Sequence, residues 1–462
     1  MTVYKATIHG EGFSVPAPEL DIDTRKVDQA DGKPLSPDEI KELQMFNQQY
    51  THTVLSGKHY IARQRYNAAT GGMAMAFEPL SEFRNYFLCS PKIAGMNAGK
   101  AWLHWPGKNF MPGGVTFQPN VSECPKEVFN LWQGYKVPAE KGDVGAFLHH
   151  VRKALCSGDE EVSQYLIQWF AHMLQKPDEK PSVAVLLKSV EGTGKGTMVR
   201  PFEQILGQHF VQLNGDEHLT GKFNSLVANR LLVFADEVRL TDPKKADKLK
   251  AMISEPTVNM ERKGIDAEPI PNFARFVFAS NHDHVLMAGQ RERRYLVVEP
   301  DAKYAQNKAH FKALYGWLNH GGARHLLHYL LNLDISQFDP HHAPVTKGLI
   351  AEKLQSMKPV QQWCYSWLET HSMPNSQPLA ARIEGKELAD KYREWAKDNI
   401  HLDVTQRSAE TQVGNLMRAM DINKTRSTPQ SPRMFELFEV KDMCKRFAGI
   451  LGHTTEEVFS EI

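Results

Sequence analysis

The stretch that decides the fold is Glu191-Gly192-Thr193-Gly194-Lys195-Gly196-Thr197. It follows Val183 to Leu187, an uncharged β-branched and leucine-rich segment that predicts a buried parallel strand. It precedes residues 198–206, which predict a helix ending at Gly207. Glycines between a strand and a helix let backbone N–H groups turn toward an anion, and the helix N-terminus favours phosphate. This order of elements is typical of a phosphate-binding loop, in which Lys195 would reach the β- and γ-phosphates of a nucleotide.

The loop departs from the full pattern G-x-x-x-x-G-K-[ST]. Ser189 stands at the first glycine position, and Gly196 stands where the pattern has the hydroxyl residue that holds Mg²⁺. Thr197 offers a hydroxyl one residue later, about 100° further round a helix. Taken alone, the heptapeptide could also be an ordinary glycine-rich turn. The choice between this turn and a phosphate-binding loop therefore depends on the other motifs of the chain.

Composition narrows the class of protein. The 462 residues suffice for roughly two to four domains, and 55 Lys and Arg against 54 Asp and Glu leave a net charge of +1. A contact with nucleic acid would therefore have to be local. The five cysteines include no C-x-x-C pair, which argues against a disulfide framework or zinc ribbon and fits a reducing compartment. Without a membrane-length apolar run or a signal-peptide pattern, we expect a cytoplasmic protein with no membrane partner.

The chain before the loop divides into three parts. Residues 1–45 are polar and turn-rich and predict a loosely ordered leader. Residues 46–124 predict a small β-rich module, with strands on either side of Gly71 and Gly72. This module lacks the clustered carboxylates of a primase site, so a structural role is favoured. Residues 125–180 predict a helical collar, because 144–154 and 162–174 carry apolar residues at helical spacing.

The core is predicted over residues 181–300. Leu231 to Ala235 predict a second buried strand that ends in Asp236 and Glu237. Ligands gather at the carboxyl ends of strands in an open α/β sheet. Asp236 is therefore placed to hold Mg²⁺, directly or through water, and Glu237 to polarise an attacking water. A strand that merely ends in solvated acids is the alternative, and the upstream phosphate loop disfavours it.

Three further core segments carry candidate residues. Residues 274–280 predict a strand ending at Asn281, whose amide could orient the water or sense the γ-phosphate, although Ser-Asn alone is only a turn signal. Residues 257–260 and 269–270 predict a hairpin with a basic tip at Lys263. If the protein forms a ring, this hairpin could point into the channel and place Lys263 against DNA phosphates. Without the other motifs, an ordinary surface hairpin would be the favoured interpretation. The run 291–295 is either a solvated charged face or a source of an arginine finger.

The C-terminal third predicts a helical extension over residues 301–371 and a further domain over 372–462, behind a linker at 372–378. Helices at 387–398 and 410–420, a basic loop at 424–433 and a strand at 434–438 suggest a winged helix. Its second helix could enter a DNA groove, with Arg426 or Arg433 at a phosphate. A dimerising or purely structural tail is nearly as well supported.

The order of these motifs, GTGKGT, LLVFADE, ERKG, FASN and RERRY, resembles the superfamily-3 helicases, the AAA+ type ring motors of small DNA viruses, plasmids and phages. The chain is most similar to the helicase portion of phage and plasmid primase–helicase proteins, over roughly residues 120–365. The resemblance implies an α/β fold with an AAA+ type P-loop NTPase core. It also implies ATP-driven translocation on single-stranded or forked DNA by a ring, usually a hexamer, during replication of a phage, satellite or plasmid in a bacterial cytoplasm, with replication partners in trans.

The resemblance also assigns roles to residues. Lys195 becomes the phosphate-loop lysine, Asp236 and Glu237 the Mg²⁺ and water acids, Asn281 the sensor, and Arg293 or Arg294 the arginine finger. Lys263 becomes the channel-hairpin lysine, with Arg262 and Lys250 as further DNA contacts. ATP and Mg²⁺ are the implied cofactors, and Asp236 and Thr197 are the candidate metal residues.

Two expectations follow from the departures from the family pattern. The family's fused primase domain is expected to be absent, so no primer synthesis is expected. Gly196 removes the usual Mg²⁺-binding hydroxyl and thereby supports a second hypothesis, a non-hydrolysing DNA-binding replication initiator or regulator on the same scaffold. Glu237 argues against this second hypothesis, because a scaffold needs no water-activating acid.

Overall fold

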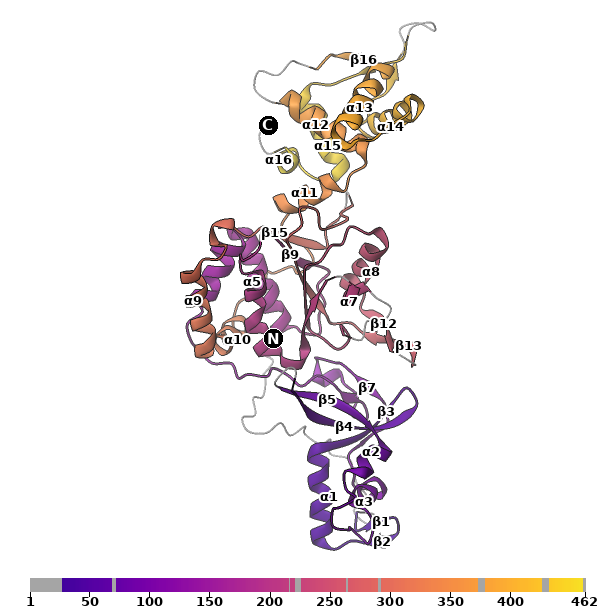
Figure 1. Ribbon diagram of the computed structural model, residues 1–462, viewed down its shortest axis with the longest axis vertical. Helices are drawn as coiled ribbons and strands as arrows, with labels where there is room; N and C mark the ends of the chain where they lie inside the picture. The colour runs from indigo at the N-terminus through magenta and orange to yellow at the C-terminus, as the bar shows by residue number, and fades with distance from the viewer. Residues whose placement is uncertain are drawn as a thin grey trace.

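Figure 1 shows a computed structural model, which describes residues 27–68, 72–215, 217–220, 226–262, 265–289, 292–372, 379–425 and 432–459. The molecule is elongated. An N-terminal part lies at one end, an α/β body occupies the middle, and a mainly helical C-terminal part lies at the other end (Figure 1). In the described part of the chain, no helix is both long and apolar enough to cross a membrane.

The N-terminal part is built on a four-stranded sheet of order β5-β4-β3-β6. The predicted hairpin is confirmed, since β4 pairs antiparallel with β5. Helices α2 and α3, which the β-rich prediction did not include, cover the sheet together with α1. The elements are β1 (Gln29–Ala30), β2 (Lys33–Pro34), α1 (Pro37–Gln49), β3 (Tyr50–Leu55), β4 (Lys58–Asn67), β5 (Gly72–Pro79), α2 (Leu80–Asn85), α3 (Ala98–His104) and β6 (Phe110–Met111).

The prediction of a loosely ordered leader is wrong for residues 27–45. Ser36 caps α1 in a capping box with Glu39, and a proline occupies the first turn, so the helix start is well specified. Leu43 is fully buried in the aromatic cluster that contains Phe83 and Trp102. Apolar burial and capping together order this segment. Residues 1–26 lie outside the described residues.

The predicted collar helices form, but they belong to the main core. β7 (Val115–Thr116), η2 (Val121–Glu123) and β8 (Phe129–Asn130) lead to α4 (Gly145–His149), the π-helical segment η3 (His150–Leu155) and α5 (Glu160–Gln175). Asp159 caps α5 by accepting the Val162 N–H. Trp169 and Phe170 of α5 are buried in one cluster with strand residues such as Val185. Helix α5 is therefore one of the helices that cover the parallel sheet.

The body is an all-parallel five-stranded sheet of order β10-β11-β14-β9-β15. Its strands are β9 (Ala184–Lys188), β10 (Phe210–Asn214), β11 (Leu232–Asp236), β14 (Arg275–Ser280) and β15 (Tyr295–Val298). Strands β9, β11 and β14 confirm the three predicted strands, whereas β10 and β15 were not predicted. β14 lies between β9 and β11, with Val277 opposite both Val185 and Phe234. The inner strands are buried on both faces, which explains their uninterrupted apolar runs.

Helices cover both faces of this sheet (Figure 1). One face packs on α5, α6 (Lys195–Leu206) and α10 (Ala323–Leu331), and the other on α7 (Glu217–Thr220) and α8 (Pro243–Ser254). The predicted hairpin is confirmed as β12 (Thr257–Arg262) and β13 (Ile265–Pro271). Lys263 at its tip, and the side chain of Arg262, lie outside what the structure describes. The remaining elements are η4 (Gly207–His209), η5 (Ala302–Tyr304), α9 (Lys308–Trp317) and η6 (Leu318–Gly322).

The C-terminal part has a hydrophobic core of its own, which includes Trp363, Tyr392 and Phe447. Helix α11 (Lys347–Gln355) connects it to the body. A small antiparallel sheet of order β16-β18-β17 packs with the helices. The elements are α12 (Pro359–Ser372), β16 (Arg382–Glu384), α13 (Gly385–Ile400), α14 (Gln406–Ala419), β17 (Lys424–Thr425), β18 (Met434–Glu436), α15 (Val440–Leu451) and α16 (Thr455–Val458). Arg426 and most of the predicted linker lie outside the described residues.

Candidate functional site

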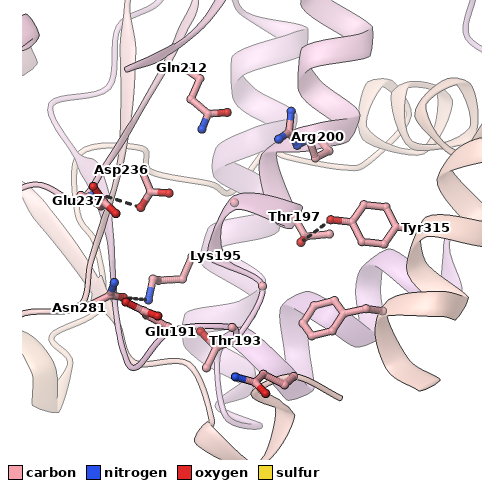
Figure 2. Close-up of a pocket in the computed structure, with 15 residues that line it drawn as sticks. Glu191, Thr193, Lys195, Thr197, Arg200, Gln212, Asp236, Glu237, Asn281 and Tyr315 are labelled. Carbon is pink, nitrogen blue, oxygen red and sulfur yellow. Dashed lines mark hydrogen bonds between the residues drawn. The ribbon is translucent and has the colours of Figure 1, made fainter. Parts of the chain in front are cut away.

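A cavity of about 610 Å³ opens at the carboxyl edge of the parallel sheet (Figure 2). The loop after β9, the end of β11 and the end of β14 meet there, and α9 forms the opposite wall. Neighbouring strands are about 4.8 Å apart, so β14 separates the ends of β9 and β11 by roughly 10 Å. The lining residues are 191–197, Arg200, Gln212, Asp236, Glu237, Asn281, Gln306, Phe311 and Tyr315.

The loop at residues 191–197 depends on two of its glycines. Gly192 and Gly194 have φ values of +77° and +92°, a region that L side chains rarely adopt. A Cβ on Gly194 would also lie 2.6 Å from His150 Cε1 and 2.7 Å from Phe311 Cε1. Gly196 is different, because a Cβ there would meet Phe234 only at 3.9 Å. The structure therefore requires glycine at position 194 but not at position 196.

Lys195 lies at the centre of the cavity. Its Nζ donates to the carbonyl oxygens of Ser189 at 2.7 Å and Val190 at 3.0 Å, and to Asn281 Oδ1 at 2.5 Å. Burial lowers the pKa of Lys195, and the carboxylates of Asp236 and Glu191 oppose that shift. The Lys195 ammonium is thus bonded to neutral oxygens, and the oxygens of a phosphate could replace them as its partners.

Asp236 and Glu237 reach the cavity at the end of β11, as their sequence position predicts. The Glu237 N–H donates to Asp236 Oδ1 at 3.0 Å. Glu237 has a φ of +56°, a left-handed conformation that costs a non-glycine residue on the order of 1 kcal/mol or more. The turn directs two adjacent carboxylates into the same cavity. Strain of this kind clusters at functional sites, which makes this turn a candidate for one.

Thr197 lines the same cavity as Asp236 but faces a different wall of it. Its hydroxyl lies 3.3 Å from the Tyr315 hydroxyl and faces α9, whereas Asp236 lies on the other side of Lys195 (Figure 2). The Thr197 hydroxyl is thus directed at α9, and the pairing of Asp236 and Thr197 at a metal stays a prediction. In the described part of the chain, no group of three His, Cys, Asp or Glu side chains could hold a metal by itself. Mg²⁺ fits here only as it usually binds, through one or two carboxylates together with substrate phosphates.

Arg293, Arg294 and Lys250 lie away from this cavity. Arg294 immediately precedes β15, whose first residue, Tyr295, pairs with Ala184 at the start of β9, opposite the phosphate loop. Arg294 Nε donates to Ser254 Oγ at 2.9 Å. Lys250 Nζ is 3.7 Å from a carboxylate oxygen of the buried Glu292. These cations gather at the amino end of the sheet and do not line their own chain's cavity.

Several residues of the cavity were missed by sequence reasoning. Phe311 and Tyr315 come from α9 more than a hundred residues after the loop, and their i, i+4 spacing, which places both on one helix face, was the available signal. Arg200, Gln212 and Gln306 also line the cavity without belonging to a motif.

His150 is a buried polar neighbour of the loop. Its Nε2 lies 3.2 Å from the Gly194 carbonyl oxygen, and its Nδ1 lies 2.9 Å from His310 Nε2. Burial lowers the pKa of His150 to about 4, so the ring is neutral near pH 7. A neutral ring that donates to Gly194 and accepts from His310 would hold the turn in place.

Parts of this chain are similar to known proteins. A family of unknown function, DUF5906, matches residues 187–294, which contain the loop, both acids and Asn281. The DNA Primase-polymerase of Nitratiruptor phage NrS-1 is 30% identical over 137 residues, which are 29% of this chain and 19% of that protein. The aligned segment therefore spans about a fifth of the phage protein.

Solved structures extend the likeness to most of the fold. The apo structure of the NrS-1 C terminal region (305–718) matches with a TM-score of 0.65 and 16% identity, and its A form matches with a TM-score of 0.62 and 16% identity. Each match covers 86% of this chain and 98% of the other. The chain is thus homologous in part to a phage replication protein and shares the mixed α/β fold of its C-terminal region.

Proposed function

We propose that this chain is an ATP-dependent DNA translocase of the superfamily-3 helicase type that acts in phage replication. One observation carries the proposal: a glycine-rich loop with Lys195, the acids Asp236 and Glu237, and the amide of Asn281 converge on one cavity from three neighbouring parallel strands. The insertion of β14 between β9 and β11 supports an AAA+ type core, since it places a polar strand end between the loop and the acids. Partial homology to a phage primase-polymerase supports the replication context.

The chain's own residues divide the work of hydrolysis. The N–H groups of the loop and the N-terminus of α6 bind the phosphates, and Lys195 leaves its carbonyl partners for the β- and γ-oxygens. Asp236, joined by phosphate oxygens, would hold Mg²⁺, which would neutralise charge on the transferred phosphoryl group. Glu237 orients the attacking water and takes its proton. Asn281, already bonded to Lys195, would contact the γ-phosphate and so distinguish ATP from ADP.

A neighbouring subunit would complete the site. Arg293 and Arg294 lie at the far end of the sheet in their own chain, which suits a finger supplied in trans across a ring interface, here a hexamer. The β12–β13 hairpin, with Arg262 and Lys263, together with Lys250, would face single-stranded DNA in the channel. Closure of the site on ATP would then move the hairpin along the strand.

The test is the ATPase rate of the full chain with and without single-stranded DNA. We expect DNA to stimulate hydrolysis, Lys195→Ala to abolish nucleotide binding and hydrolysis, and Glu237→Gln to bind ATP without hydrolysing it. Lys263→Ala should lose only the stimulation, and Lys397→Ala, a matched change at an exposed lysine of α13, should behave as native. Equal, zero rates for the native chain and Lys195→Ala, with DNA binding intact, would refute the proposal.

A second candidate is a non-hydrolysing DNA-binding initiator or regulator. Gly196 and the orientation of Thr197 favour it, since neither supplies a hydroxyl to a metal at the loop. Measuring Mg²⁺ binding to the ATP-bound protein separates the two. The scaffold predicts ATP binding without Mg²⁺ dependence, and no difference between Glu237→Gln and the native chain.

A further inference from the structure

Helix α14 of the C-terminal part has two unlike faces. Arg407, Thr411, Asn415 and Arg418 are exposed and recur at intervals of four, four and three residues. At 3.6 residues per turn these four positions fall within an arc of about 80°, so they form one stripe. The opposite face is buried in the domain core through Ala409, Val413, Leu416 and Met417. The domain therefore fixes α14 by its apolar face and presents the polar stripe outward.

The four side chains of the stripe include two arginines and no acid, while Glu410 and Asp421 lie beside it, three residues after Arg407 and Arg418. Within the residues that the structure describes, no carboxylate forms an ion pair with Arg407 or Arg418. Other arginines of the same domain are paired: Arg382 with Glu436, and Arg393 with Asp390 at 3.6 Å. The two stripe arginines are eleven residues apart, which is about 16 Å along a helix.

The stripe is accessible in the folded chain. Helix α14 lies at the lateral edge of the C-terminal part, at the right in Figure 1. A five-residue connection, residues 401–405, joins it to α13, and Thr405 caps its start. Strands β17 and β18 follow it, with Lys424 exposed on β17. All four side chains of the stripe are exposed in the folded chain and can be reached by a partner.

We propose that this face of α14 is a binding site for double-stranded DNA and lies in the major groove. The groove is about 12 Å wide and admits one α-helix. Arginine pairs bidentately with guanine or with phosphate, asparagine pairs with adenine, and threonine contacts either base edges or a thymine methyl. Because base pairs rise about 3.4 Å each, the stripe spans roughly five base pairs. This site is separate from the ATP cavity and recognises a duplex, whereas the proposed motor grips a single strand.

The experiment measures binding of the full chain to a labelled DNA duplex of about 30 base pairs, well beyond the roughly five that the stripe covers. Fluorescence anisotropy is followed over a salt series. The double variant Arg407→Ala/Arg418→Ala should weaken duplex binding about tenfold or more and reduce the salt slope by about two. A control of equal charge, Lys397→Ala/Lys441→Ala, removes two exposed lysines from other helices of the domain and should change affinity less than about twofold.

Three further readouts make the result specific. DNA-stimulated ATPase should be unchanged in the Arg407→Ala/Arg418→Ala variant, and Lys195→Ala should bind the duplex as native, so failure of the motor proposal leaves this test valid. Duplex RNA should compete poorly, because its major groove is too deep and narrow to be read. Native-like duplex affinity in the arginine variant, an equal loss in the lysine control, or equal competition by duplex RNA would each overturn the proposal.

Discussion

Two glycines two residues apart allow a paired test of the phosphate loop. Gly194 has a φ of +92° and no room for a side chain, while Gly196 lies in the first turn of α6 with open space beside it. We predict that Gly194→Ala disables the loop and that Gly196→Ala does not. The two variants add the same methyl group to the same loop, so each serves as the control for the other.

The magnitudes follow from the geometry. A left-handed backbone costs alanine about 1–2 kcal/mol. The new Cβ would lie 2.6 Å from His150 Cε1 and 2.7 Å from Phe311 Cε1, and overpacking of this kind costs about 1–3 kcal/mol more, because His150 is fully buried and cannot withdraw. Gly194→Ala should therefore destabilise the body by roughly 2–5 kcal/mol. Gly196→Ala should gain up to about 1 kcal/mol of helix propensity.

The assay combines thermal unfolding with binding of a fluorescent ATP analogue. The Tm of the body should fall by roughly 5–15 °C for Gly194→Ala and stay level or rise for Gly196→Ala. Analogue binding should fall by about tenfold or more for Gly194→Ala only, since the displaced turn no longer directs its N–H groups at phosphate. If Gly194→Ala bound and melted as native, the loop would not need the left-handed turn, and the assignment of residues 191–197 as a phosphate loop would be refuted.

Two further predictions concern the metal and pH. Gly196→Ser fits the open space beside Phe234 and restores a hydroxyl at the usual position, so the Mg²⁺ concentration for half-maximal hydrolysis should fall several-fold in a titration; an unchanged midpoint would exclude metal contact there. His209 Nε2 accepts the Gln133 N–H at 3.1 Å, and burial lowers its pKa to about 3. The unfolded histidine titrates near 6.5, so the stability it supports is complete above pH 6.5 and declines as pH falls toward 3. Melting curves from pH 7.5 downward should show this decline, and His209→Gln should lessen it.

The sequence predicts the body well because its signals are local. Uninterrupted apolar runs specify β9, β11 and β14, and Gly207 marks the end of α6. The strand order is not local, and nothing in the sequence around 275–280 says that β14 lies between the other two strands. The leader shows the opposite error. Its capping box, Ser36 and Glu39, is a local signal that the prediction from composition did not use.

The candidate site also has one part that the sequence predicts and one part that it does not. Lys195, Asp236, Glu237 and Asn281 follow strands that their own sequences define, and the parallel sheet collects their ends at one edge. The α9 wall depends instead on tertiary packing, through the contact of His310 with His150. The Thr197 hydroxyl faces Tyr315 of α9 because a one-residue offset on a helix changes direction by about 100°, which spacing alone understates.

The distribution of positive charge constrains how hydrolysis could proceed. Inside the cavity of one chain, Lys195 is joined by Arg200, whose guanidinium is bonded to Glu203 at 2.8 Å and would have to leave that partner to reach a phosphate. Arg293 and Arg294 lie beyond the amino end of β9, whose five residues at about 3.3 Å each separate them from the loop by roughly 16 Å, farther than an arginine side chain extends. A phosphoryl transfer that uses Arg293 or Arg294 therefore requires a second chain, whereas one that uses Arg200 does not. Assembly and catalysis are coupled in the first case and independent in the second, so the rate per chain rises with protein concentration only if the finger acts in trans.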